Sequence, residues 1–539
     1  MTQEFSFNLV DKPWLPCVDA DGRFVELNLR QLFAQAHQLR ALEGESPPVT
    51  AALHRFLLAI LHRVFGPADY EEWADLWQAE QWDMDAINAY LDEWQHRFDL
   101  FDAERPFYQS ATLYLESNWV SVNRLVHHLN AAYPLFNHAE TSIKNSLKPV
   151  EAAAALIAAQ GFSLCGTSGA FFPRKSQREA KKQAMFVDGV NARGISFLIQ
   201  GKSLFETLML NLIQYPYDQV VSHFDDDAPV WEQNDPTSPE RRPLLGYLDY
   251  LTWQNRRILL RPEVDNQGET TVVQLRWEPA KRLDSSTLDS MQHHIKNKKE
   301  GFRLLHFNEN RVLWRDSAAL FELHRAGDDS ATNFPPATFH WLKELLDEPE
   351  TGLDDTNVYQ CMALGMSTKP GQATVYFYRD EYIPLPLAYF QTPDLVMQLR
   401  DALERTDLLS KALYHAIQVM GMHWQIPDAD NKKWGEINRN AKSAINDWVD
   451  YTGAERHYWA SLDVPFQSLI VELPQDTETA RANWWAQLRQ SAQNAFDQAA
   501  EYTGSGPRSF KAVVRGQSYL NYRLSELFPK PETQKEKVL

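Results

Sequence analysis

The segment Cys165 to Gly169, CGTSG, places a thiol and two hydroxyls beside two glycines. Either Cys165 or Ser168 would be the nucleophile of a stand-alone hydrolase. However, the segment departs from the G-x-S-x-G pattern and follows a helical run instead of a strand. A nucleophile also needs a base within hydrogen-bond reach, which the sequence does not identify. The same turn is equally explained as a helix C-cap or as a backbone loop that approaches a ligand.

Two adjacent histidine pairs, His127-His128 and His293-His294, raise the question of a metal site. Neighbours at i and i+1 do not share a helix face, so neither pair matches the two ligands of an H-x-x-x-H motif. We therefore predict no metal and no cofactor, and we expect these histidines on the surface or in loops. No C-x-x-C pair occurs among the three cysteines, Cys17, Cys165 and Cys361, which favours a reducing cytoplasm.

Three stretches combine small turn-forming residues with lysines and arginines. Backbone N–H groups of such turns approach phosphates closely, and the nearby cations supply charge. For each stretch alone, the alternative is a solvated charged surface. Together they favour nucleic-acid binding by discrete loops at residues 165–182, 293–301 and 367–373.

The elements that would position these loops form a mixed α/β region. Residues 7–33 alternate apolar and polar types around an ADG turn and predict a hairpin before a first helix. Helical spacing continues over residues 48–66, 69–98 and 147–164, whereas the chain is irregular between residues 110 and 146. Strands are predicted over residues 194–201, 251–264, 271–279 and, after a Pro-Gly turn, 373–386.

Beyond this region the pattern becomes helical. Four segments with loops between them predict an α-helical bundle: residues 394–424, 441–453, 479–504 and 511–528. We therefore predict an α+β chain, with a large mixed α/β N-terminal domain over residues 1–386 and a C-terminal four-helix bundle with a frayed tail over residues 387–539.

Composition restricts the function classes further. The chain has 539 residues and a net charge of -19, which argues against a protein that coats nucleic acid unspecifically. Seventeen tryptophans favour large cores and a sizeable partner surface. The N-terminus lacks the pattern of a signal sequence, and no apolar run is long enough for a membrane span. We expect a soluble cytoplasmic protein.

Several motifs occur in an order and spacing that resemble a known family, the large subunit of the type I-E CRISPR surveillance complex Cascade, called CasA. The motifs are FNLVDKPWLPC, RPFYQ, LFNH, ALIAAQGFSLCGTSG, LTWQNRRILL, VLWRDSAAL and GQATVYFYRDEYIPLP. The resemblance extends over nearly the whole chain. It implies a large α/β domain followed by a four-helix bundle, as the pattern of elements also predicts.

The resemblance implies a subunit that is not an enzyme and acts in antiviral defence. Such a subunit recognises the protospacer-adjacent motif (PAM) in double-stranded DNA, helps to open the duplex and contributes to recruiting a helicase-nuclease. Its implied partners are the other Cascade subunits, the CRISPR guide RNA, target DNA and the helicase-nuclease, with no membrane. The alternatives are a stand-alone hydrolase using the Cys165 loop and a protein-interaction scaffold without a DNA role.

Three DNA-contacting elements follow from the resemblance. A glycine loop falls on five consecutive residues, three of which are not glycine: Cys165, Gly166, Thr167, Ser168 and Gly169. The absence of a side chain suits glycine to close approach. A minor-groove lysine falls on Lys296 or Lys298, with Lys299 as a further candidate. A glutamine wedge, which parts the first base pairs, falls on the hairpin tip at Gly371 and Gln372.

The resemblance also gives a role to the irregular stretch between residues 125 and 146, which matches a family loop that reaches toward the guide RNA. Phe136 and Asn137 are the predicted contacts. Five cations after the glycine loop form a basic apron near the incoming duplex: Arg174, Lys175, Arg178, Lys181 and Lys182.

Overall fold

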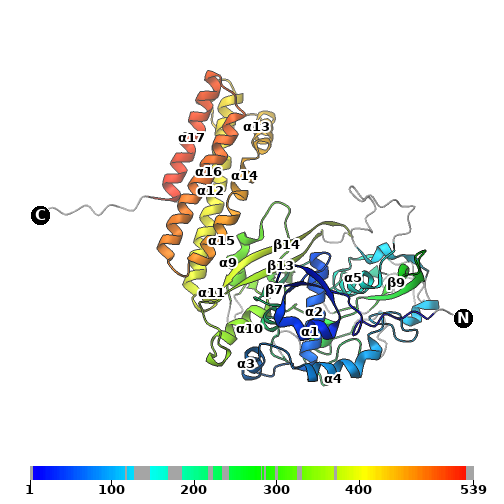
Figure 1. Cartoon of the computed structure of the whole chain (residues 1–539). Coiled ribbons are helices and arrows are strands. Elements are labelled where there is room, and N and C mark those ends of the chain that lie inside the picture. The colour runs from blue at the N-terminus through cyan, green and yellow to red at the C-terminus, as the bar shows by residue number, and fades with distance from the viewer. Residues whose placement is uncertain are drawn as a thin grey trace. The chain divides into compact units, whose positions relative to one another are not determined.

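The computed structural model describes residues 4–115, 118–126, 146–167, 185–216, 223–233, 242–280, 282–283, 287–297, 301–323, 331–368 and 373–529. The chain divides into two compact units, Met1–Ile383 and Pro384–Leu539. The first unit mixes helices and strands, whereas the second unit is helical (Figure 1). The predicted fold class is therefore confirmed.

The core of the first unit is built around helix α2. This helix begins with two prolines and is apolar on nearly every face, so it is buried on all sides. Its Phe56 ring is in contact with the rings of Trp14, Phe107 and Trp231. The helices of this unit are α1 (Leu29–Gln35), α2 (Pro47–Val64), α3 (Tyr70–Gln78), α4 (Met84–Trp94), α5 (Pro149–Phe162), α7 (Leu204–Leu210), α8 (Tyr247–Leu251), α9 (Ser317–Phe321) and α10 (Ala337–Leu346).

The strands of the first unit form small antiparallel sheets instead of one large sheet. The sheet orders are β2-β1-β3, β11-β10-β12, β14-β13-β7, β4-β9-β8 and β5-β6. The strands are β1 (Leu15–Asp19), β2 (Phe24–Leu27), β3 (Leu39–Leu42), β4 (Val120–Ser121), β5 (Gly166–Thr167), β6 (Met185–Phe186), β7 (Ser196–Gln200), β8 (Arg256–Val264), β9 (Thr270–Pro279), β10 (His294–Asn297), β11 (Gly301–Leu304), β12 (Asn333–Phe334), β13 (Val358–Thr368) and β14 (Val375–Pro386).

The predicted N-terminal hairpin is confirmed. Strands β1 and β2 pair from Leu15 opposite Leu27 to Val18 opposite Phe24. Gly22 in the turn has a φ of 81°, a conformation that glycine adopts without strain. The helical spacing over residues 69–98 corresponds to two helices, α3 and α4. The helical conformation is interrupted between them, where Glu80 has a φ of 56°.

The second unit is a bundle in which α12, α16 and α17 run side by side (Figure 1). Helices α17 and α12 meet at Gly516, where an added Cβ would lie 2.8 Å from Ala416 O. The helices are α11 (Ala388–Gln391), α12 (Pro393–Gln425), α13 (Arg439–Thr452), α14 (Ala454–Ala460), α15 (Asp463–Glu472), α16 (Thr477–Glu501) and α17 (Pro507–Leu527). The four predicted segments correspond to α12, α13, α16 and α17, and the shorter α14 and α15 connect α13 to α16.

Candidate nucleic-acid interface

The glycine loop predicted at Cys165 to Gly169 starts from a defined stem. Helix α5 ends at Phe162, and the N–H of Ser163 closes it by donating to Ala159 O at 3.3 Å. Strand β5 then pairs with β6, with Gly166 opposite Phe186. The two chain ends at residues 167 and 185 therefore lie side by side, as in the stem of a hairpin.

A buried arginine, Arg256 at the start of β8, holds both sides of this stem. Its Nη2 atom donates to Leu164 O at 2.9 Å and to Val187 O at 2.8 Å. Its Cζ atom lies 4.8 Å from the ring centroid of Phe186. Burial lowers the pKa of Arg256 to about 9, and the Asp188 carboxylate opposes this shift. Because one guanidinium bonds both carbonyls, it fixes the width of the stem.

The Cys165 thiol lies beside a second charged group, Arg193. The Cys165 N–H donates to Asp188 Oδ1 at 2.7 Å, and Arg193 forms an ion pair with the same carboxylate at 2.9 Å. The Arg193 Nη2 atom also lies 3.4 Å from Cys165 Sγ. These contacts orient the start of the loop through its backbone and its thiol, and they position a guanidinium next to it.

Lys296 lies on a hairpin made by β10 and β11. It stands opposite Phe302 in the pairing, and its backbone N–H donates to Thr332 O at 2.7 Å. Its side chain is exposed. Gly301, which starts β11, has a φ of 77°, as a tight hairpin requires. The hairpin therefore presents Lys296 to solvent on a fixed strand.

The predicted wedge belongs to a second and longer hairpin. Strands β13 and β14 are hydrogen-bonded neighbours, and residues 369–374 connect them. Pairing of β13 with β7, from Gln360 opposite Gln200 to Leu364 opposite Ser196, anchors this hairpin on its other side. Figure 1 shows β13 and β14 as long adjacent strands. The predicted tip thus stands on a three-stranded base.

One short segment, Arg193 to Ser196, contacts the bases of all three elements. Arg193 bonds Asp188 at the β5-β6 stem, and the Ile195 N–H donates to Leu305 O beside the β10-β11 hairpin at 3.1 Å. Ser196 pairs with β13 as described above. A Cβ at Gly194 would lie 2.6 Å from Gln292 Nε2, so a larger residue there would require the Gln292 side chain to move. The Arg193–Ser196 segment, called the frame below, therefore connects the bases of the three predicted elements.

Behind this frame lies a buried polar network centred on Asp289. Arg55 of α2 forms an ion pair with Asp289 at 2.9 Å, and both side chains are almost inaccessible to solvent. The Asp289 carboxylate also accepts hydrogen bonds from Asn191, from Tyr250 of α8 and from the Met291 backbone. Asn191 precedes the frame, and Met291 precedes the β10-β11 hairpin. Because Asp289 bonds both residues, it fixes the position of the hairpin relative to the frame.

Most predicted contacts lie outside the described residues. Cys165, Gly166 and Lys296 are placed as above, and Thr167 is placed by its backbone in β5. The contacts outside the described residues are Phe136, Asn137, Ser168, Gly169, Arg174, Lys175, Arg178, Lys181, Lys182, Lys298, Lys299, Gly371 and Gln372. The sequence reasoning missed Asp188, Arg193, Arg256 and Asp289. Arg256 lies in a predicted strand, but its neighbours Gln254, Asn255 and Arg257 are polar, so the sequence carried no sign of its burial.

The expectation that His293 and His294 lie on the surface or in loops is wrong as to the surface, although His293 lies in an irregular segment before β10. Both side chains are buried, because they precede and begin the inner strand of the β11-β10-β12 sheet. Burial lowers the pKa of His293 to about 4. His127 and His128 lie outside the described residues. Within the described part of the chain, no group of three or more His, Cys, Asp or Glu residues has the geometry of a metal site. No described helix combines the length and apolar character needed to cross a bilayer.

Comparison with known proteins gives a consistent result. The chain matches the family described as CRISPR-associated protein Cse1 over residues 8–495. It is 30% identical over 531 residues to CRISPR-associated protein CasA/Cse1 of Thermus thermophilus. The aligned residues cover 97% of this chain and 98% of the relative. The crystal structure of Thermus thermophilus CasA is similar with a TM-score of 0.76 at 27% identity, over 97% of this chain and 100% of that chain. A chain of a structure described as "CRISPR RNA-guided surveillance complex" shares the fold, with a TM-score of 0.71 at 22% identity over 96% of this chain and 100% of that chain.

Proposed function

The chain belongs to the CRISPR-associated protein Cse1 family, and from this premise we propose that it is the large subunit of a CRISPR RNA-guided surveillance complex of type I-E. The observation that carries the proposal is the similarity over almost the full length of both this chain and its Thermus relative. The shared fold with a chain of a solved surveillance complex supports it. Its partners in this proposal are the other subunits and the guide RNA.

Within such a complex, the subunit recognises the protospacer-adjacent motif in double-stranded DNA. Guide pairing reads most of the target sequence, so the protein needs only a few contacts beside it. The convergence of the β5-β6 stem, the β10-β11 hairpin and the β13-β14 hairpin on residues 193–196 supports this role. It gives an acidic chain three local elements that act on one stretch of duplex.

In the same proposal the subunit helps to open the duplex and to recruit a helicase-nuclease, and it performs no catalysis itself. The contacts of Cys165 bear on the hydrolase alternative. Within the described residues, its thiol contacts the Arg193 guanidinium, and its N–H contacts the Asp188 carboxylate. An arginine does not accept the thiol proton, so this neighbour does not serve as the base of a nucleophile pair.

Reconstitution of the guide-RNA complex with and without this chain tests the proposal. Binding is measured by gel shift against a library of duplex targets that differ only in the flanking motif. We expect discrimination between motifs to require the chain, while a target already unpaired beside the motif binds with less dependence on it. Unchanged discrimination without the chain would falsify the DNA-recognition role and favour a scaffold. Turnover of ester or amide substrates that is lost in Cys165→Ala would favour the hydrolase.

A further inference from the structure

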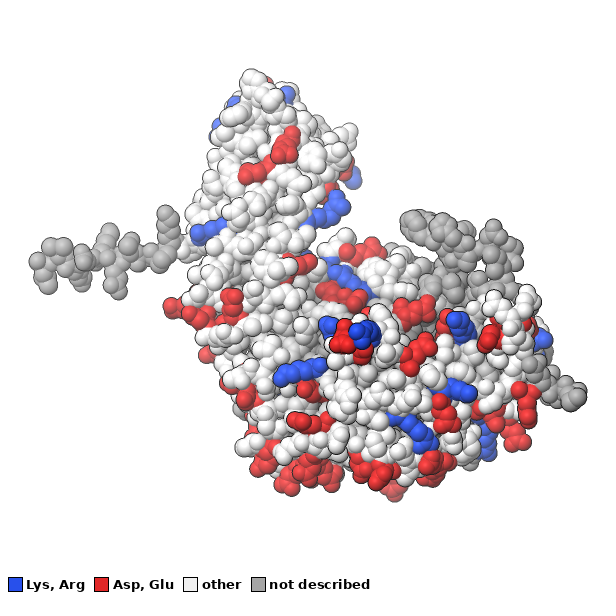
Figure 2. Space-filling view, in the orientation of Figure 1, with Lys and Arg blue, Asp and Glu red and all other residues white. Residues whose placement is uncertain are grey.

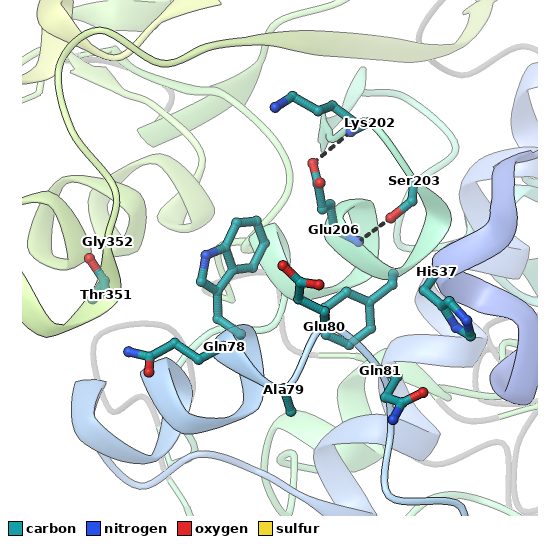
Figure 3. A pocket seen from close by; sticks show the side chains of 12 residues that line it. His37, Gln78, Ala79, Glu80, Gln81, Lys202, Ser203, Glu206, Thr351 and Gly352 are labelled. Carbon is teal, nitrogen blue, oxygen red and sulfur yellow. Dashed lines mark hydrogen bonds between the residues drawn. The ribbon is translucent and has the colours of Figure 1, made fainter.

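A cavity that shares no lining residue with the candidate interface lies between three turns of the first unit. It has a volume of about 1020 Å³ and is lined by the end of α3, the start of α7 and the turn at Thr351 and Gly352 (Figure 3). None of the residues predicted to contact nucleic acid lines it. The cavity is therefore a separate site, whose chemistry follows from its own walls.

The walls of this cavity are held rigidly. Trp73, which is buried, donates from its indole N–H to Met209 O at 3.1 Å and so ties α3 to α7. Gln78 donates to Glu350 O at 2.7 Å and ties α3 to the turn before Gly352. Trp77 stacks on Trp73 with ring centroids 5.2 Å apart and also lines the cavity. One face of the Trp77 indole is thus covered, and the residue contributes an aromatic surface to a preformed hollow.

A carboxylate with no protein partner among the described residues completes the site. Figure 3 shows the Glu80 side chain directed into the cavity from the turn that follows α3. Glu80 has a φ of 56°, a left-handed conformation that a non-glycine residue seldom adopts. By contrast, Glu206 is occupied, because its Oε2 atom accepts from the Lys202 N–H at 2.8 Å, and the exposed Lys202 side chain is a cation in the same wall.

The surface around the cavity is acidic. Figure 2 shows Asp and Glu side chains gathered along the edge of the first unit where α3 and α4 lie in Figure 1. The first turn of α3 carries Glu71 and Glu72. On the side of the turn at Gly352, Glu348 and Glu350 act on Tyr70 of α3 and raise its pKa together with Glu71. A negative field therefore surrounds the cavity and disfavours nucleic acid there.

We propose that this cavity is a docking site for a protein segment that presents an arginine or lysine side chain. An aromatic face and a free carboxylate are the two groups that bind a guanidinium or ammonium, by cation–π attraction and by a charge-assisted hydrogen bond. The acidic surroundings complement a basic segment and would attract it from solution. The proposal does not depend on the nucleic-acid role of the chain.

The test uses the full chain labelled with 5-fluorotryptophan and followed by ¹⁹F NMR, with the Trp77 resonance assigned from Trp77→Phe. The probe is a peptide of three arginines, compared with the same peptide containing citrulline, which is uncharged and nearly isosteric. We expect the arginine peptide to shift the Trp77 resonance with saturation, and citrulline to leave it unchanged. Glu80→Gln should weaken the apparent affinity at least about fivefold, which corresponds to about 1 kcal/mol.

Glu93→Gln is the matched control, because Glu93 is an exposed carboxylate of α4 outside the cavity and its replacement changes the net charge equally. Retained affinity in this variant supports the site. Equal weakening in both variants would show a nonspecific charge effect and overturn the proposal. So would an unmoved Trp77 resonance, or a shift produced by oligothymidine in place of the arginine peptide.

Discussion

At the residue scale, Lys296 is the described cation that the proposed function uses most directly. It is exposed on β10, and its strand is bonded on both sides, by β11 and by β12. If its ammonium neutralises one DNA charge, Lys296→Ala should lower the slope of log K against log salt by about 0.9. The measurement is target binding by the reconstituted complex over a salt series.

The matched variant for this measurement is Lys12→Ala, which removes an exposed lysine near the N-terminus. We expect its salt dependence to equal that of the unmodified chain. An identical decrease in both variants would mean that Lys296 acts only through net charge, and the assignment to the DNA groove would fail.

Gln372 gives the second prediction at this scale. A wedge must separate stacked base pairs, which costs a few kcal/mol per step. Gln372→Ala should therefore slow opening of an intact duplex and spare a target that is already unpaired beside the motif. Fluorescence of 2-aminopurine at the first base pairs measures the opening. Gln360→Ala, at the opposite end of β13, is the control. Equal loss on both substrates would reject the wedge.

Single residues also show which parts of the candidate site the sequence can indicate. The sequence pointed to Cys165, Gly166 and Lys296 because turn residues and cations are visible locally, and their roles stay predictions. Asp188, Arg193 and Asp289 were not, because their roles consist of contacts with residues elsewhere in the chain, such as the pair between Arg55 and Asp289. A buried charge is indistinguishable from a surface charge until the partner that compensates it is known.

At the element scale, the interface between α12 and α17 depends on Gly516. An added Cβ would meet Ala416 O at 2.8 Å, and Met420 and Phe496 at 3.0 Å. Although alanine favours helix by about 1 kcal/mol, overpacking two helices costs about 1–3 kcal/mol. We expect Gly516→Ala to lower the free energy of unfolding of the helical unit, measured by urea titration of the far-UV circular dichroism.

Gly435→Ala is the control for that substitution. Gly435 has no heavy atom within 4 Å of a built Cβ and lies in the same unit. Its replacement should leave the urea midpoint unchanged or raise it slightly. A stabilising effect of Gly516→Ala would show that the two helices separate easily, contrary to the packing described.

Helices and strands were predicted correctly where the periodic hydrophobic pattern extends over many residues. The spacing predicted α2, α5 and α12, and the alternation predicted β8 and β9. The break between α3 and α4 at Glu80 was missed, because an isolated left-handed glutamate has no compositional signal. Strand β13 was also missed: it is buried along almost its whole length and lacks the alternation of a half-exposed strand. Its backbone is paired on both sides, by β14 and β7, and helix α2 packs against it.

At the scale of the whole molecule, a net charge of -19 is compatible with the proposed DNA role, because the acidic residues and the cations of the candidate interface lie on different elements. Acidic residues gather at α3 and α4 (Figure 2), whereas the candidate interface uses a few cations on or near hairpins, such as Arg193 and Lys296. Affinity for duplex DNA by the chain alone should therefore be weak. Specific recognition would then require the guide RNA and other subunits to hold most of the nucleic acid.

Buried histidines give the whole molecule a dependence on pH. His54 and His62 lie inside α2, and burial lowers their pKa to about 4 and about 3 respectively. Both are neutral in the folded chain, whereas the unfolded chain binds protons below pH 6.5. The unfolded state therefore gains protons first as the pH falls. Their contribution to stability is complete above pH 6.5 and is lost progressively as the pH approaches the folded values.

His62 is the histidine that isolates this effect, because neither of its ring nitrogens has a hydrogen-bond partner among the described residues. His62→Leu removes the titrating group and retains an apolar side chain. The free energy of unfolding should then fall less steeply between pH 6 and pH 4, by about 1.4 kcal/mol per pH unit. Urea titrations at each pH measure the slope. His306→Leu, at an exposed histidine of the same unit, should leave the slope unchanged. If His62→Leu also leaves it unchanged, His62 is not held neutral in the folded chain.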